Sequence, residues 1–236
     1  MPAATETATG RPSKWADDIP VAGGEAIWPL LAVWAVVIIV WRMLKTFLPH
    51  EDFQFWRVQL ALVEQVLLIG VLYYLLYVRS DEGLVDGLHL HLRPIWHWFG
   101  GLGLGVAYFV TVEVLLLHVS LGKPMLGAGQ TDVVKLLFVT VLYIVAAMVN
   151  ELFYRGLIYP LVRRAIGVLG SVLVVTLWFA LVRSAYAGGD WWRTGAVVGL
   201  SLILTLARVF SRGVAAPIGI HLGFGLSLCV SLWLPE

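Results

Sequence analysis

The stretch from Asn150 to Pro160 reads N-E-L-F-Y-R-G-L-I-Y-P and lies near the end of a long apolar run. Its Glu151 and Arg155 are four residues apart, so both lie on one face of a helix. An ionised side chain in the hydrocarbon region of a membrane costs about 3 kcal/mol on insertion scales unless it finds a partner or a water-filled cavity. The stretch therefore predicts a functional site within a membrane helix, with Arg155 as the partner of Glu151. A structural ion pair that fixes two helices is the alternative.

The composition is that of a membrane protein. Of the 236 residues, 60% are hydrophobic and 13% are charged, whereas about a quarter of the residues of an average soluble domain are charged. The formal net charge is only +1, so no basic surface argues for a nucleic-acid partner. A single cysteine, Cys229, excludes an intrachain disulfide and is expected to be a small buried residue.

The apolar segments predict an all-α, polytopic transmembrane bundle of about seven spans, each near the length of roughly 20 residues that a bilayer requires. The expected spans are residues 27–41, 58–78, 95–119, 133–159, 168–186, 194–210 and 214–234. Residues 1–25 are expected to form a polar, disordered tail, and residues 26–236 a transmembrane helical domain. The distribution of Arg and Lys indicates a cytoplasmic N-terminus, in a membrane of the bacterial inner-membrane type.

Two further features lie within the predicted spans. Gly100 to Gly105 reads G-G-L-G-L-G, but no strand precedes it, so it predicts close packing of membrane helices and not a dinucleotide-binding loop. Glu64, Glu113 and His118 are polar residues inside spans, and they leave a transporter or channel open as a third interpretation. Glu64 is expected to be protonated or hydrogen-bonded to a neighbouring helix. The paired broken helices of many secondary carriers are not evident.

Three motifs follow one another in the C-terminal half: N-E-x-x-x-R-G at residues 150–156, F-A-L-V-R at 179–183 and R-G-V-A-A-P-I-G-I-H at 212–221. In order and spacing they resemble the CPBP family of intramembrane metalloproteases, which includes the CAAX prenyl proteases and the bacteriocin-processing and immunity (Abi-like) proteins. The resemblance covers about residues 133–234. It implies that Glu151, Arg155 and His221 occupy catalytic positions of the family.

The family pattern is E-E-x-x-x-R, then F-x-x-x-H, then H-x-x-x-N or a similar polar residue. The resemblance implies that the first glutamate and the second-motif histidine activate water, and that the third-motif histidine and its partner stabilise the oxyanion. This chain departs from the pattern at three of these positions: Asn150, Arg183 and Gly225. A carboxamide is no general base near neutral pH, arginine stays protonated and offers no acceptor, and glycine has no side-chain donor.

These departures predict a loss of catalysis. A missing oxyanion donor typically costs about 100- to 1000-fold in rate, and a missing base about 100- to 10,000-fold. We therefore expect a catalytically impaired or inactive pseudoenzyme that acts as a scaffold, an immunity-type factor or an accessory subunit. Its expected partners are the lipid bilayer and another membrane protein or membrane peptide. Arg183 is expected to swing toward Glu151, giving one carboxylate between two guanidiniums.

The alternative is an active intramembrane endopeptidase with a rearranged site. In that case Glu151 would be the base, and His221 would be an oxyanion donor or a metal ligand. Only this alternative would use a divalent metal. The interpretation as a pseudoenzyme expects no cofactor.

Overall fold

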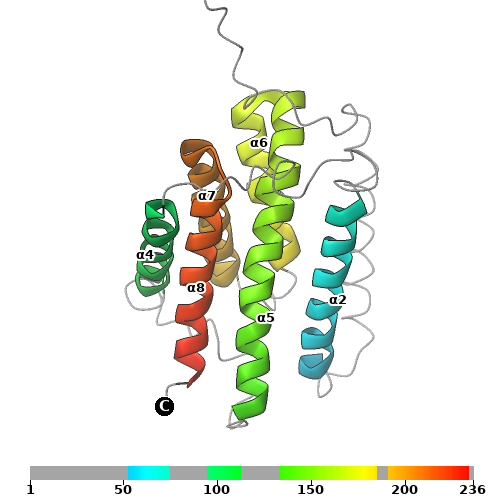
Figure 1. Cartoon of the computed structure of the whole chain (residues 1–236), viewed down its shortest axis with the longest axis vertical. Helices are drawn as coiled ribbons and strands as arrows, with labels where there is room; N and C mark the ends of the chain where they lie inside the picture. The colour runs from blue at the N-terminus through cyan, green and yellow to red at the C-terminus, as the bar shows by residue number, and fades with distance from the viewer. Residues whose placement is uncertain (1–52, 75–94, 113–132, 185–190, 234–236) are drawn as a thin grey trace, which may run out of the picture.

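Every element in the described part of the chain is a helix, as the composition predicts. The computed structural model describes residues 53–74, 95–112, 133–184 and 191–233. The elements are α2 (Phe53–Tyr73), α4 (Trp96–Val110), α5 (Val133–Glu151), η5 (Leu152–Ile158), α6 (Tyr159–Ser184), α7 (Trp191–Ser211) and α8 (Ala215–Trp233) (Figure 1). They overlap six of the seven predicted spans, while residues 27–41, Glu113 and His118 lie outside the described residues. How many helices cross a bilayer stays a prediction.

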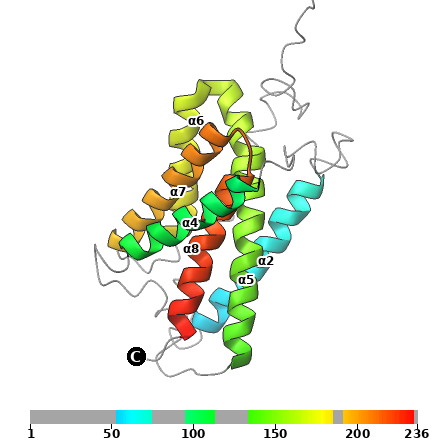
Figure 2. The ribbon, with the colours of Figure 1, turned by 60° about the vertical axis from the view of Figure 1, so that its left-hand side comes forward.

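Two stretches among the described residues are long and apolar enough to cross a membrane. They are Leu137–Arg183, with 47 residues, and Trp191–Ser211, with 21 residues. A straight helix of the former length would extend roughly 70 Å at 1.5 Å per residue, far beyond a hydrocarbon core of about 30 Å. The chain instead reverses at Gly167, whose φ of 76° and ψ of −178° are accessible essentially only to glycine. Figures 1 and 2 both show the resulting two arms meeting at one end of the molecule.

The position of this turn differs from the boundary that the sequence suggests. Pro160 is expected to end the fourth span, yet the helix continues through it as far as the turn at Gly167. The π-helical segment η5 lies directly before Pro160. A wider helical turn accommodates the proline ring, which in a regular α-helix would collide with the carbonyl group four residues earlier.

Helices α4 and α8 approach each other very closely. The glycines that face one another are Gly101, Gly105, Gly219 and Gly223. A Cβ atom added at Gly101 would lie 2.6 Å from the Ala216 carbonyl oxygen, and one added at Gly219 would lie 2.6 Å from the Trp98 carbonyl oxygen. The prediction of close helix packing is therefore confirmed, and the glycine-rich stretch is part of a helix and not a dinucleotide-binding loop.

The main apolar core surrounds η5. Phe153, Tyr154 and Leu157 of η5 are buried against Leu68 of α2 and Phe179 of α6. The Tyr154 and Phe179 rings meet edge to face, with centroids 5.2 Å apart. Phe153 and Tyr154 lie between Glu151 and Arg155 in the sequence. Their packing therefore also fixes the two ionisable side chains inside the bundle.

Candidate functional site

The local backbone around the first motif is unusual. From Leu152 to Ile158 the chain is π-helical, and the Tyr159 N–H donates to the Tyr154 carbonyl oxygen, five residues earlier. By the same spacing the Arg155 carbonyl oxygen would need a donor at residue 160, which is a proline and has no N–H. π-Helical turns are rare and frequently occur at functional sites. The motif therefore combines two charged side chains with a main-chain carbonyl that lacks its regular helical donor.

Glu151, Arg155 and His221 meet at one carboxylate oxygen. Arg155 Nη1 donates to Glu151 Oε1 at 3.1 Å, which confirms the partner predicted from the spacing. His221 Nδ1, from α8, lies 2.7 Å from the same oxygen. With Glu151 ionised, the His221 tautomer that has its proton on Nδ1 donates a hydrogen bond to this oxygen. Glu151 and Arg155 have fully buried side chains, and that of His221 is 14% exposed.

Arg155 is also bound to α7. Its Nη2 donates to the Ser201 hydroxyl at 2.8 Å, to the Ser201 carbonyl oxygen at 3.1 Å and to the Thr205 hydroxyl at 3.4 Å. Its guanidinium carbon lies 4.6 Å from the centroid of the Phe179 ring. One buried cation thus connects the end of α5, α6 and α7, and its charge is balanced by Glu151 and dispersed over several acceptors.

Arg208 supplies the donor that Pro160 lacks. Its Nε donates to the Arg155 carbonyl oxygen at 3.0 Å, from a side chain that is only 7% exposed. Its guanidinium carbon lies 5.6 Å from the centroid of the Tyr159 ring. A charged donor to an otherwise orphaned carbonyl is the strong kind of hydrogen bond in a buried setting. Arg208 therefore holds η5 against α7 at the turn that presents Arg155.

Residues on α7 were not anticipated as part of this site. Ser201, Thr205 and Arg208 recur at a spacing of four and then three residues, so they form one polar stripe on an otherwise apolar helix. This stripe was a usable signal, because polar residues of a membrane helix normally face the protein interior. Their partners, however, are 46 to 53 residues away in the sequence.

The three residues predicted to depart from the family pattern lie in different surroundings. Asn150 is fully buried, and within the described ranges neither its Oδ1 nor its Nδ2 has a hydrogen-bond partner. The half-buried Arg183 has its guanidinium carbon 5.7 Å from the centroid of the Phe179 ring, the ring that Arg155 also contacts. Gly225 lies one helical turn after His221, and a Cβ atom there would meet nothing within 4 Å. Arg183 therefore reaches the cluster, while its expected bond to Glu151 stays a prediction.

The donor set near Glu151 does not fit a divalent metal. Within the described ranges, no three side chains of His, Cys, Asp or Glu lie close enough together to hold one. Glu151 and His221 would give two ligands, but one carboxylate oxygen already accepts from Arg155 and His221. A catalytic zinc site normally has three protein ligands. Arg183, which the sequence comparison predicts to stand at the family's histidine position, has no lone pair for a metal.

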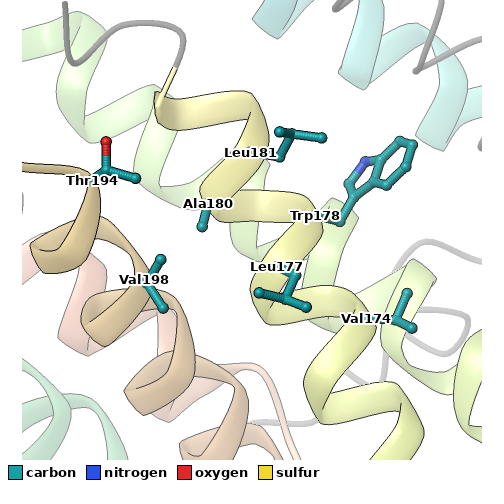
Figure 3. A pocket seen from close by; sticks show the side chains of 7 residues that line it. All are labelled: Val174, Leu177, Trp178, Ala180, Leu181, Thr194 and Val198. Carbon is teal, nitrogen blue, oxygen red and sulfur yellow. The ribbon is translucent and has the colours of Figure 1, made fainter. Parts of the chain in front are cut away.

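A separate groove of about 470 Å³ lies between the second arm of α6 and α7 (Figure 3). It is lined by Val174, Leu177, Trp178, Ala180, Leu181, Thr194 and Val198. Thr194 is the one polar residue of this lining, and none of the seven is titratable. The groove therefore offers no acid or base, and among the described residues the cluster around Glu151 is the candidate site.

Comparison with known proteins agrees with the three motifs. The family model described as Rce1-like, type II CAAX prenyl endopeptidase Rce1-like, matches residues 132–227. This segment begins with α5 and includes Glu151, Arg155, Arg183, Arg208 and His221. No curated protein and no solved structure matches the chain. The match over residues 132–227 is to an Rce1-like domain, which belongs to the CPBP family that the motifs resemble.

Proposed function

We propose that this CPBP-type membrane protein is a pseudoenzyme that acts by binding. In this account the family's catalytic centre has become a structural ion-pair network. The protein serves as a scaffold, an immunity-type factor or an accessory subunit for another membrane protein or membrane peptide. The Rce1-like domain and the apolar helices support its assignment to the membrane.

One observation carries the proposal: Glu151 Oε1 accepts hydrogen bonds from both Arg155 and His221. A general base needs a lone pair directed at its water and a pKa near the working pH. His221 is bound through Nδ1 to the same oxygen, which orients its ring within the network.

The replaced positions support the same conclusion. Asn150 cannot serve as the family's first glutamate, and Arg183 cannot take a proton from water. With Glu151 as the carboxylate and Arg155, Arg183 and Arg208 as guanidiniums, the cluster has an excess of positive charge. Guanidiniums have no lone pair that could take a proton from water, so in this account they balance the charge of Glu151 in a fixed ion-pair network.

A second candidate function is intramembrane proteolysis at a rearranged site. It is favoured by Glu151 Oε2, which is buried and accepts no hydrogen bond from the residues that the structure describes. A water bound to this oxygen would have a carboxylate on one side and the partly exposed His221 nearby. In that case Glu151 would act as the base and His221 as the oxyanion donor.

Peptide cleavage by the purified protein separates the two functions. We would reconstitute it in nanodiscs and measure the hydrolysis of a quenched-fluorescence library of single-span peptides and prenylated C-terminal peptides. Glu151→Ala and His221→Ala are the paired variants, and circular dichroism checks that all three proteins are folded. We expect no cleavage above the rate of the variants. Cleavage by the unmodified protein that is lost in both variants would establish the endopeptidase.

A further inference from the structure

Helix α2 turns two adjacent polar side chains toward the protein interior. Glu64 is 6% exposed and Gln65 is 1% exposed. They lie on the same helical face as Leu68 and Leu72, which belong to the core around η5. Among the described elements α2 packs against α5 and η5, so this face, including Gln65, is directed at that pair.

Gln65 and Asn150 are both buried, and the described residues give neither carboxamide a partner. Nε2 and Oε1 of Gln65 and Nδ2 and Oδ1 of Asn150 have no hydrogen bond within this part of the chain. A buried polar group without a partner costs about 1–3 kcal/mol in a protein and several kcal/mol in a lipid environment. Buried polar groups are almost always satisfied, by protein or by ordered water. We therefore expect a ligand at these two carboxamides.

The two carboxamides border the same apolar core from two helices that pack against each other. Leu68 follows Gln65 by about one turn, and Phe153 follows Asn150 by about one turn, and both apolar residues belong to the core cluster around η5. The two helices rise in the same direction, as the colours in Figures 1 and 2 show. Each carboxamide therefore lies on the helix face that borders this core.

The hydrogen-bonding groups of the two carboxamides determine which ligand they can hold. Each carboxamide offers two N–H donors and a carbonyl acceptor and has no charge. Two neutral carboxamides supply no charge that would balance a cation or an anion buried between apolar helices. Water donates and accepts equally well, and buried waters typically make two to four hydrogen bonds to such groups.

We propose that Gln65 and Asn150 hold ordered water between α2 and α5. The site is one residue from Glu151 along α5, so water is stored next to the motif at the position where the family pattern has a glutamate. Asn150 binds this water without being able to accept its proton. The inference does not depend on whether the protein cleaves peptides, because the carboxamides need the same ligand in either case.

X-ray radiolysis of the intact protein in ¹⁸O-labelled water provides the test, because side chains next to bound water are hydroxylated rapidly even when they are buried. Leu68 lies next to the proposed site, and Leu157 is the matched control. Both are leucines of the same core cluster with 0% exposure. We expect Leu68 to be modified several-fold faster than Leu157. Equal rates for the two leucines would overturn the proposal.

Thermal unfolding of Gln65→Leu and Asn150→Leu gives an independent readout. If water satisfies the carboxamides, each apolar replacement loses those hydrogen bonds and lowers the melting temperature. The second replacement should then cost less than the first, because the shared water is already lost. If the carboxamides are unsatisfied, each replacement removes a penalty and raises the melting temperature, which would contradict the proposal.

Discussion

Replacing Arg155 by methionine should strongly destabilise the protein. Methionine replaces the aliphatic part of the arginine side chain but removes every donor to Glu151, Ser201 and Thr205. It leaves the Glu151 carboxylate fully buried, with His221 as its remaining hydrogen-bond donor among the described residues. The variant therefore tests whether the cluster is a structural ion-pair network.

The expected loss can be estimated from the burial of the pair. Breaking a buried ion pair by removing one partner costs about 3–5 kcal/mol, because the other charge stays uncompensated. For a chain of 150–250 residues, each kcal/mol changes the melting temperature by about 2–4 °C. We therefore expect Arg155→Met to lower the melting temperature by about 6–20 °C.

The assay is thermal unfolding in detergent, followed by intrinsic tryptophan fluorescence. Arg163→Met is the control, because Arg163 is exposed on α6, and its loss should change the melting temperature very little. In the double variant Glu151→Gln/Arg155→Met the uncompensated charge is gone, so it should melt at a higher temperature than Arg155→Met alone. The reasoning is refuted if Arg155→Met melts like the unmodified protein, or if the double variant is less stable than the single one.

Three other substitutions probe separate parts of the account. Arg208→Gln removes the Nε donor to the Arg155 carbonyl oxygen and should cost about 1–3 kcal/mol in chemical denaturation; an unchanged midpoint would argue against this role. Gly101→Leu would collide with the α8 backbone, whereas Gly103→Leu points into open space, so only the former should lower the melting temperature. Arg183→Gln should also destabilise the protein in detergent, and unchanged melting would count against a structural role for this guanidinium.

Local spacing and composition were enough to predict part of the site and the class of the fold. Glu151 and Arg155 are one helical turn apart, so their pairing depends on helix geometry alone. The glycines of the third predicted span could be assigned to helix packing, because a membrane interface favours small residues. Neither inference required knowledge of which helices are neighbours.

The remainder depends on contacts between distant segments. The helix passes through Pro160 because η5 widens just before it and Arg208 compensates for the missing donor. A residue 53 positions from Arg155 cannot be selected from spacing around the motif. Likewise, the reversal at Gly167 follows from one glycine with a positive φ among several glycines in apolar segments. The roles of Asn150 and Gly225 remain predictions from the family pattern.

The most direct test of the central claim is to restore the family's residues and compare rates. We would measure cleavage of the quenched-fluorescence peptides by the unmodified protein and by the triple variant Asn150→Glu/Arg183→His/Gly225→Asn, with the triple variant lacking Glu151 as the blank. The account predicts no cleavage by the unmodified protein and a rate above the blank for the restored one. Equal cleavage by the unmodified and restored proteins, each above the blank, would contradict it, because the three substitutions would then have cost no catalysis.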